Sequence, residues 1–429
     1  MTTGIAGRTI LNAAAELGRG RRPEFRDLLI APSNIKVLAD ELAHMRGAAM
    51  KMGQLLSMDT GDVLPPEMTD ILARLRDNAH YMPPKQLKQV LNSGWGTDWL
   101  GKFERFDVQP IAAASIGQVH RAKLKDGRDV AVKVQYPGVA RSIDSDVSNV
   151  GALVKLSGMV PKGFDMAPFL AEARAQLHEE TDYLLEGSHL QAFGAWLADD
   201  SGFEVPAFHA DWSTKEILTM SFVEGRPIED VQDLDAETRN SVATRLITLL
   251  LRELFEFKAV QSDPNFANYR YNPKTNRIVL LDFGATRALD PALVAHYRSL
   301  FAAGVAGDKD GVRKAAGHIG FLSPTDRAED QERIGRMIGM VFDALRADDI
   351  YDFNSKVLSQ QMHVEGMALA ESGYVPPPLP MDALYLQRKF GGIFLLANRL
   401  KARLPLRALL EKGIDAAGCD STSATVESA

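Results

Sequence analysis

The chain has 429 residues, of which 45% are hydrophobic and 24% are charged, a balance typical of a globular protein with a sizeable core. Its formal net charge of -7 gives no broad attraction for a polyanion, so we expect no nucleic-acid partner. The single cysteine, Cys419, excludes an internal disulfide, and the apolar runs are too short and too closely bracketed by charges for a transmembrane helix.

Changes in periodicity divide the chain into five segments. We expect a flexible lead-in (1–34), an N-terminal helical extension (35–102), a first lobe of strands with a helical insertion (103–223), a helical second lobe (224–416) and a disordered tail (417–429). Within the extension, apolar residues recur at alternating spacings of four and three, which predicts one helical stripe. The stripe consists of Leu38, Leu42, Met45, Ala49, Met52 and Leu56.

Strand and helix signals follow in order along the two lobes. The apolar run Val130–Val134 after the turn signal Asp126–Gly127 predicts a hairpin. A long helix is expected from Asp165, with Pro168 in its first turn, up to the break at Asp199–Gly202. Further on we expect a strand at Lys215–Val223, a helix at Ala236–Phe257, a buried strand at Arg277–Leu281 and helices from Asp290 to about Lys412.

Lys133 lies in the apolar strand that follows the hairpin turn. A cation in such a strand is costly unless an anion meets it. In a kinase-like small lobe, the anions are the α- and β-phosphates of ATP and a carboxylate from a helix. Alone, this pattern also fits a solvated lysine at the edge of a strand.

Asp263 and Asn268 stand five residues apart just after an apolar helix. This is the spacing of a kinase catalytic loop, in which the carboxylate orients the phosphate acceptor and the amide oxygen helps to hold a metal ion. The buried strand that follows delivers Asp282-Phe283-Gly284, so that Asp282 can face the same metal ion. Each pattern alone also fits an ordinary turn, but the four residues in this order favour a kinase-like fold that binds ATP and Mg²⁺.

The predicted helix from Asp165 supplies two further carboxylates. Glu180 falls on the same stripe as Leu177 and Leu184, so we expect it to pair with Lys133, with a solvated Glu180 as the alternative. Asp182 points away from that stripe and would make a different contact.

A run of small residues stands where a kinase would carry its glycine-rich flap. The run is Ala112-Ala113-Ala114-Ser115, and its methyl groups narrow the allowed backbone, so the loop cannot close over phosphates as glycine does. We therefore expect an atypical nucleotide geometry. In the early helix, Lys51 and Gln54 share a face, a pattern that alone also fits a solvated surface.

Six motifs in order, between about Lys36 and Arg287, resemble those of the UbiB protein-kinase-like family. They are Lys51-x-Gly53-Gln54, the alanine run followed by Ile116-Gly117-Gln118-Val119-His120, the lysine strand, Glu180-Thr181-Asp182-Tyr183, Asp263–Asn268 and Asp282-Phe283-Gly284. Asp263-Pro264-Asn265-Phe266 stands where Asp-Pro-His-Pro is common elsewhere in the family. The sequence therefore most resembles the branch of the coenzyme Q kinase-like ATPases.

The resemblance implies an α+β, atypical protein-kinase-like two-lobed fold with the N-terminal helical extension over the active site. It implies ATP binding with hydrolysis, or phosphorylation of a small or lipid-like molecule, in support of ubiquinone biosynthesis. Lys133 would bind phosphates, Asp263 would orient the nucleophile, and Asn268 with Asp282 would hold Mg²⁺. Met220, Ser221, Phe222 and Val223 would form the adenine hinge, while Lys51, Gln54 and Ala112–Ser115 would shape an occluded pocket. The helix with Lys51 and Gln54 would fold over the active site and meet the motif of Glu180 and Asp182.

The implied ligands and partners are ATP, a quinone precursor or lipid, and enzymes of quinone biosynthesis. We expect a cytoplasmic protein with peripheral contact at the inner membrane through the early amphipathic helix. Three histidines, His120, His178 and His189, lack metal-ligand spacing and are expected to be structural.

Two other functions remain open. An ATP-binding pseudokinase scaffold would fit the restraint that the alanine run and the Lys51 helix imply, whereas the retained Lys133 and the two metal-binding candidates favour chemistry. A small-molecule phosphotransferase of the choline- or antibiotic-kinase type would share the aspartates. The Lys51–Gln54 helix argues against that type, because the element has no role there.

Overall fold

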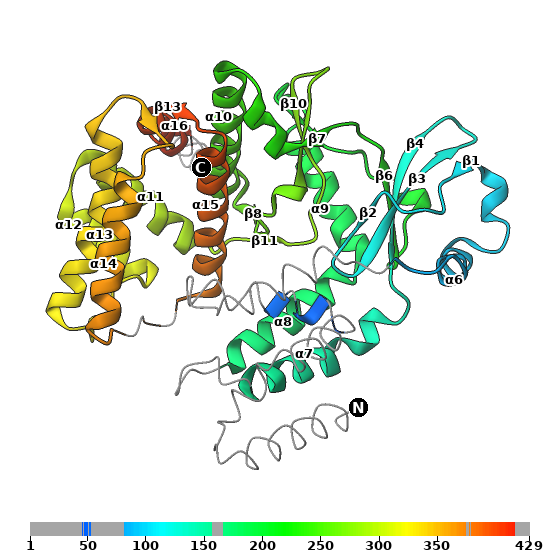
Figure 1. Cartoon of the computed structure of the whole chain (residues 1–429), viewed down its shortest axis with the longest axis horizontal. Coiled ribbons are helices and arrows are strands. Elements are labelled where there is room, and N and C mark those ends of the chain that lie inside the picture. Colours follow the sequence, from blue (N-terminus) through cyan, green and yellow to red (C-terminus); the bar gives the residue numbers. More distant parts are fainter. Residues whose placement is uncertain are drawn as a thin grey trace, which may run out of the picture. The chain divides into compact units, whose positions relative to one another are not determined.

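The structure is a computed structural model that describes residues 45, 47–49, 51–52, 81–156, 166–374, 377 and 379–416. The chain forms two compact units (Figure 1): a first unit of Met1–Gln191 with Ala207–Phe222, and a second unit of Ala192–Pro206 with Val223–Ala429. The predicted lead-in, most of the stripe between residues 38 and 56, and the predicted tail lie outside the described residues.

A five-stranded antiparallel sheet is the centre of the first unit (Figure 1), with the strand order β1-β3-β4-β6 and β2 paired to β3. The predicted hairpin is present, because β3 pairs antiparallel with β4 on either side of the turn. Gly127 in that turn adopts a φ of 96°, which other residues rarely tolerate. Helix α6 and the 3-10 turn η2 precede the sheet. Their bounds are α6 Pro84–Trp95, η2 Trp99–Lys102, β1 Phe103–Phe106, β2 Ala112–Ala113, β3 Gly117–Leu124, β4 Asp129–Gln135 and β6 Ile217–Ser221, with a 3-10 turn η3 at Ala210–Trp212.

Apolar side chains alternate along β4, so that its two faces have different surroundings. Val130, Val132 and Val134 are fully buried in a core that also contains Trp99 and Phe103. Because successive side chains in a strand point to opposite faces, Lys133 projects from the face opposite to this aromatic core. The sheet thus carries a cation on its second face.

The helices of the first unit correct one prediction. A single helix from Asp165 to the Asp199–Gly202 break is wrong, because α8 (Ala167–Glu180) ends and α9 (Tyr183–Trp196) begins anew. Asp182 Oδ1 accepts the backbone N–H groups of Leu184 and Leu185 at 3.1 and 3.2 Å, which caps α9. Helix α7 (Val139–Leu156), which the sequence patterns did not indicate, packs against α8.

The second unit has two small sheets near its start. One has the strand order β5-β10-β9-β7, and in the other β8 pairs with β11. The predicted strand at Arg277–Leu281 is β10. The bounds are β5 Phe203–Glu204, β7 Arg226–Pro227, β8 Ala259–Gln261, β9 Tyr269–Asn272, β10 Arg277–Leu280 and β11 Thr286–Ala288, with 3-10 turns η4 at Ile228–Asp233 and η6 at Phe266–Asn268.

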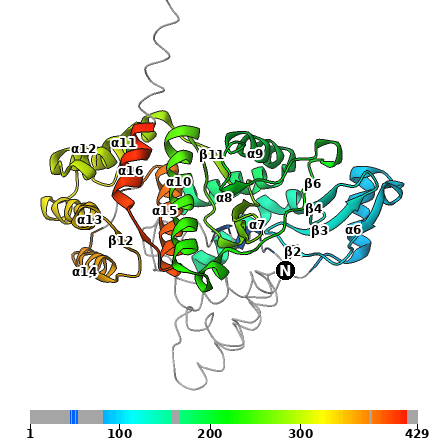
Figure 2. The same ribbon diagram turned by 90° about the horizontal axis from the view of Figure 1, so that it is seen from above.

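Helices make up most of the rest of the second unit (Figure 2), where α13 runs beside α14, and α10 packs on both α15 and α16. The predicted helix Ala236–Phe257 is α10 followed by a π-helical turn, η5. Asp235 caps α10 and Asp290 caps α11, each by accepting a backbone N–H. The bounds are α10 Ala236–Arg252, η5 Glu253–Phe257, α11 Pro291–Ala306, α12 Lys309–Ile319, α13 Ala328–Ala347, α14 Val357–Glu371, α15 Met381–Arg399 and α16 Leu406–Ala416, with strands β12 Tyr351–Asp352 and β13 Arg403–Leu404.

Among the described residues, no helix combines the length and the apolar character needed to cross a bilayer.

Candidate active site

A buried ion pair joins the sheet of the first unit to α9. Lys133 Nζ lies 2.9 Å from both carboxylate oxygens of Glu186, and the two side chains are 10% and 3% exposed. The Tyr183 ring centroid lies 5.0 Å from the same ammonium. The predicted partner Glu180 is therefore wrong, because the cap at Asp182 starts a new helix and brings Glu186 to Lys133 instead.

Glu180 has a different cation. It forms an ion pair with Lys51, whose side chain is 7% exposed, and it accepts a hydrogen bond from Ser115 Oγ at 3.0 Å. The helical residues 47–49 and 51–52 pack closely here, since a Cβ on Gly47 would lie 3.1 Å from Ile116 Cγ2. The alternatives of a solvated Lys51 and a solvated Glu180 are wrong. Gln54 lies outside the described residues.

The alanine run forms a short, paired segment. Ala112 and Ala113 pair with Val119 and Gln118 across β2 and β3, and the backbone N–H of Ala114 donates to the Gly117 carbonyl at 2.9 Å. A Cβ on Gly117 would lie 2.3 Å from the Val134 carbonyl oxygen, so only glycine fits there. The run is thus held by hydrogen bonds to β3.

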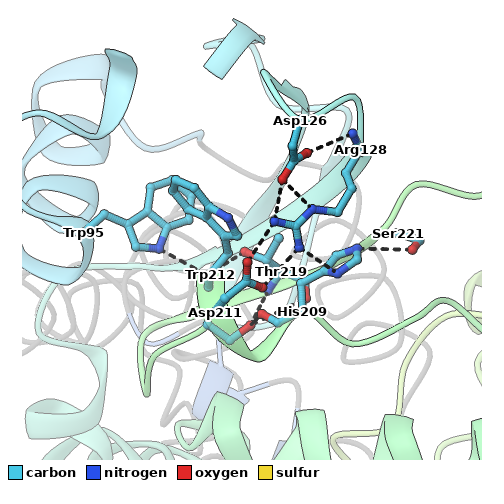
Figure 3. A network of polar contacts seen from close by, with 9 residues as sticks. Trp95, Asp126, Arg128, His209, Asp211, Trp212, Thr219 and Ser221 are labelled. Atoms are coloured by element: carbon cyan, nitrogen blue, oxygen red, sulfur yellow. Dashed lines mark hydrogen bonds and ion pairs between the residues drawn. The ribbon is translucent and has the colours of Figure 1, made fainter. Parts of the chain in front are cut away.

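The predicted hinge residues lie at the end of β6: Met220 and Ser221 belong to the strand, and Phe222 and Val223 follow it. Met220 is buried in this strand, and Ser221 Oγ lies 3.2 Å from His209 Nε2 (Figure 3). Burial, and then the charge of Arg128, lower the pKa of His209. Arg128 binds the carboxylates of Asp126 and Asp211 in the same network. The end of β6 is therefore tied to the turn between β3 and β4.

A second network in the first unit is buried. The Met82 N–H donates to Gln118 Oε1, Gln118 Nε2 lies 2.8 Å from His120 Nε2, and His120 Nδ1 lies 2.8 Å from the Asp107 carbonyl. These contacts require Gln118 to donate to an unprotonated His120 Nε2 while Nδ1 donates to the carbonyl. Burial lowers the pKa of His120, which agrees with a neutral ring.

Three predicted site residues of the second unit lie at one end of the β9–β10 pair. Tyr269 begins β9, Leu280 ends β10, and the two residues are partners in the antiparallel register. The residue before one strand therefore adjoins the residue after the other. The Leu281 N–H accordingly donates to the Asn268 carbonyl at 3.0 Å, and Asp282 is the next residue along the chain.

Hydrogen bonds orient the functional groups at this end. Asn268 Nδ2 donates to the Asp263 backbone carbonyl at 3.2 Å. This bond points the amide nitrogen toward Asp263, so the amide oxygen, Oδ1, points away from that carbonyl. Asp282 Oδ1 accepts the Gly284 N–H at 3.0 Å. Phe283 is buried, with its ring centroid 4.8 Å from that of Phe193. The strand end thus holds an amide oxygen and a carboxylate close together.

Two basic residues of α15 reach this region, and the sequence patterns missed both. Arg388 Nη2 donates to Asp263 Oδ1 at 3.0 Å. Lys389 Nζ lies 2.9 Å from the Tyr269 hydroxyl and 3.2 Å from Glu253 Oε2. The sequence offered one signal for them. The loop from Asp263 to Asn268 contains no lysine or arginine of its own, so a cation that pairs with Asp263 has to come from another segment.

A narrow cavity is lined by Asn268 and Asp282 together with Glu253, Gln261 and Lys389. Its volume of about 10 Å³ has room for about one water molecule and none for a nucleotide. Burial raises the pKa of Glu253, and the charge of Lys389 counteracts this. Burial by itself lowers the pKa of Lys389. The charges of Glu253 and Tyr269 and the hydrogen bonds to them have the larger effect, so the pKa of Lys389 is raised.

The donor set at Asn268 and Asp282 suits one kind of metal ion. Over the described part of the chain, no group of three or more His, Cys, Asp and Glu residues could hold a metal by itself. Mg²⁺ is commonly bound by one or two protein oxygens together with substrate phosphates. An amide oxygen and a carboxylate therefore fit Mg²⁺ when a nucleotide supplies the remaining ligands.

Comparisons with known proteins give consistent results. The family model of the ABC1 atypical kinase-like domain matches residues 74–316. The mitochondrial atypical kinase COQ8 of Saccharomyces cerevisiae is 36% identical over 94% of this chain and 81% of that protein. The mitochondrial atypical kinase COQ8B of Rattus norvegicus is 35% identical over 95% of this chain and 78% of that protein.

A solved structure of similar fold matches most of the chain. It is the complex of Rv3197 with erythromycin from Mycobacterium tuberculosis, with a TM-score of 0.62 and 23% identity. The match covers 94% of this chain and 97% of that one. At this identity, the likeness concerns the fold alone.

Proposed function

The chain belongs to the ABC1 atypical kinase-like family, and we propose that it binds Mg-ATP and phosphorylates a small or lipid-like acceptor in support of ubiquinone biosynthesis. Membership confirms the predicted UbiB-type resemblance and the α+β, protein-kinase-like fold. The chain is accordingly an atypical kinase. The acceptor and the individual residue roles are our proposal.

The observation that carries the proposal is the arrangement at the β9–β10 end. Asp263, Asn268 and Asp282 come from separate positions in the sequence. Asn268 donates to the Asp263 carbonyl and accepts from the N–H of Leu281, the residue before Asp282. Phosphoryl transfer depends mainly on positioning and on electrostatic stabilisation. An acid that could orient the acceptor, near two side-chain oxygens that could bind a metal ion, supports the proposal of that chemistry.

In this proposal, each residue of the site has its own role. Lys133, held by Glu186, would bind the α- and β-phosphates, and Asp263 would accept a hydrogen bond from the acceptor hydroxyl and align it with the γ-phosphate. Asn268 and Asp282 would hold Mg²⁺, which when bound neutralises charge on the phosphates. Met220, Ser221, Phe222 and Val223 remain the proposed adenine hinge.

Lys51 and Glu180 would act differently from the phosphate-binding pair. Their ion pair fixes the early helix against Ser115, at the end of the alanine run. We assign them, with Ala112–Ser115, the task of shaping an occluded pocket that excludes protein acceptors. A lipid-like acceptor at a membrane surface, such as a quinone precursor, and partner enzymes of quinone biosynthesis are consistent with this task.

The test is Mg²⁺-dependent ATP hydrolysis by the purified chain beside Asp282→Asn, with and without detergent-solubilised quinone-like phenols. Asp290→Asn is the matched control, because Asp290 is an exposed helix cap whose role asparagine can also fill. We expect turnover that the phenols raise, that Asp282→Asn abolishes and that Asp290→Asn leaves unchanged. Nucleotide binding is measured in parallel.

Binding without turnover under every condition would contradict the kinase proposal and favour an ATP-binding scaffold. Transfer of phosphate to choline or to an aminoglycoside would instead place the chain with small-molecule phosphotransferases. Mass spectrometry of the phenol after incubation separates phosphorylation from hydrolysis that the phenol merely stimulates.

A further inference from the structure

Asp263 receives a cation from a distant part of the chain. The loop Asp263–Asn268 has no lysine or arginine, yet Arg388, 125 residues further along, donates from Nη2 to Asp263 Oδ1 at 3.0 Å. The two side chains are only 19% and 22% exposed, so this pair is better shielded from solvent than a surface ion pair.

The helix that carries Arg388, α15, also contacts the residues that flank the loop at both ends. Lys389 Nζ lies 3.3 Å from Gln261 Oε1, two residues before Asp263, and 2.9 Å from the Tyr269 hydroxyl, one residue after Asn268. Both ends of the loop are therefore tied to one ammonium group.

The backbone of α15 also approaches the middle of the loop. A Cβ on Gly392 would lie 2.2 Å from Pro264 Cβ, so a larger residue at this position would displace the helix or the loop. Arg388 and Gly392 are four residues apart and share one face of the helix. One face of α15 thus meets Asp263 and Pro264 together.

We propose that Arg388 is the positioning residue for Asp263, and that α15 is the element that holds the catalytic loop. This inference rests on the function proposed for Asp263. Arg388 engages Oδ1 at 3.0 Å, whereas the hydrogen bond that Oδ2 accepts from Asn268 Nδ2 is marginal at 3.5 Å. The carboxylate is therefore held by one oxygen, and Oδ2 is presented to the acceptor hydroxyl.

Steady-state kinetics of Arg388→Met test this role. We expect kcat to fall about 10- to 100-fold, because a misplaced reacting group loses rate on that scale, while the KM for Mg-ATP and the Tm stay close to those of the wild type. Arg388→Lys should recover part of the loss, since an ammonium restores the charge but not the planar geometry. Arg399→Met, which removes an exposed arginine from the same helix, is the matched control and should leave kcat unchanged.

A double-mutant cycle separates positioning from a structural effect. In the Asp263→Asn background, Arg388→Met should cause no further fall in residual turnover, because the carboxylate it positions is already gone. An unchanged or raised kcat in Arg388→Met, or an equal loss in both backgrounds, would overturn the inference while leaving the kinase proposal intact. Wild-type chain that binds Mg-ATP without turnover would overturn both.

Discussion

Lys133 Nζ lies 2.9 Å from each carboxylate oxygen of Glu186, inside the first unit. The pair is buried, so removing one partner leaves a charge without compensation. Glu180, six residues earlier, serves Lys51 instead. The two glutamates therefore pair with different lysines, and substitutions can separate the contributions of the two ion pairs.

Glu186→Gln should destabilise the first unit by about 3–5 kcal/mol, because Lys133 stays buried and charged beside a neutral amide. It should also weaken Mg-ATP binding, since Lys133 loses the partner that positions it. Urea unfolding can be followed by tryptophan fluorescence, because Trp95, Trp99 and Trp212 cluster in this unit. Glu216→Gln, an exposed site in the same unit, is the control. Wild-type stability in Glu186→Gln would contradict the prediction.

Lys51 and Glu180 should be energetically coupled. Lys51→Met and Glu180→Gln should each destabilise the chain, and the double variant should cost less than their sum by about 0.5–3 kcal/mol. The comparison cycle uses Lys51→Met with Asp182→Asn, which keeps the α9 cap and lies outside the ion pair. That second cycle should be additive. Additivity in both cycles would show that the Lys51–Glu180 contact contributes nothing in solution.

Local chemistry made part of this structure predictable from sequence. The Asp126–Gly127 turn follows from the backbone freedom of Gly127, and the place of Lys133 on β4 follows from the alternation around it. The order of Asp263, Asn268 and Asp282 likewise placed them on a loop and at a strand end. In each case, the signal lies within a few residues of the feature.

The partners of these residues were not predictable in the same way. Glu180 and Glu186 both lie on helices with apolar faces, and the choice between them depends on a helix break that one capping side chain, Asp182, produces. Arg388 meets Asp263 only because α15 packs on the loop, which no local periodicity encodes. Tertiary packing decides such pairs.

The first unit should lose stability as the pH falls below about 6.5, the ordinary histidine value. Burial lowers the pKa of His120 in the folded state, so the unfolded chain takes up the proton first and acid favours unfolding. His209 acts in the same direction. Urea midpoints measured by tryptophan fluorescence at several pH values check this, and His120→Phe should flatten the dependence. A control variant at exposed His363, His363→Gln, should keep the wild-type slope; an equally steep slope in His120→Phe would refute the assignment.

Lys389→Met should destabilise the second unit by about 3–5 kcal/mol, because Glu253 is then buried without its cation. Lys389→Met combined with Glu253→Gln should recover much of that loss, whereas Lys412→Met at an exposed site should change little.

The penalty of Lys389→Met should also depend on pH. Burial raises the pKa of Glu253, and loss of Lys389 removes the charge that opposes this shift. A raised folded-state pKa gives stability at low pH that disappears as the pH rises, so the penalty should be smaller near pH 5 than near pH 8. Urea unfolding at both pH values measures this, and a penalty independent of pH would show that Glu253 does not change its protonation there.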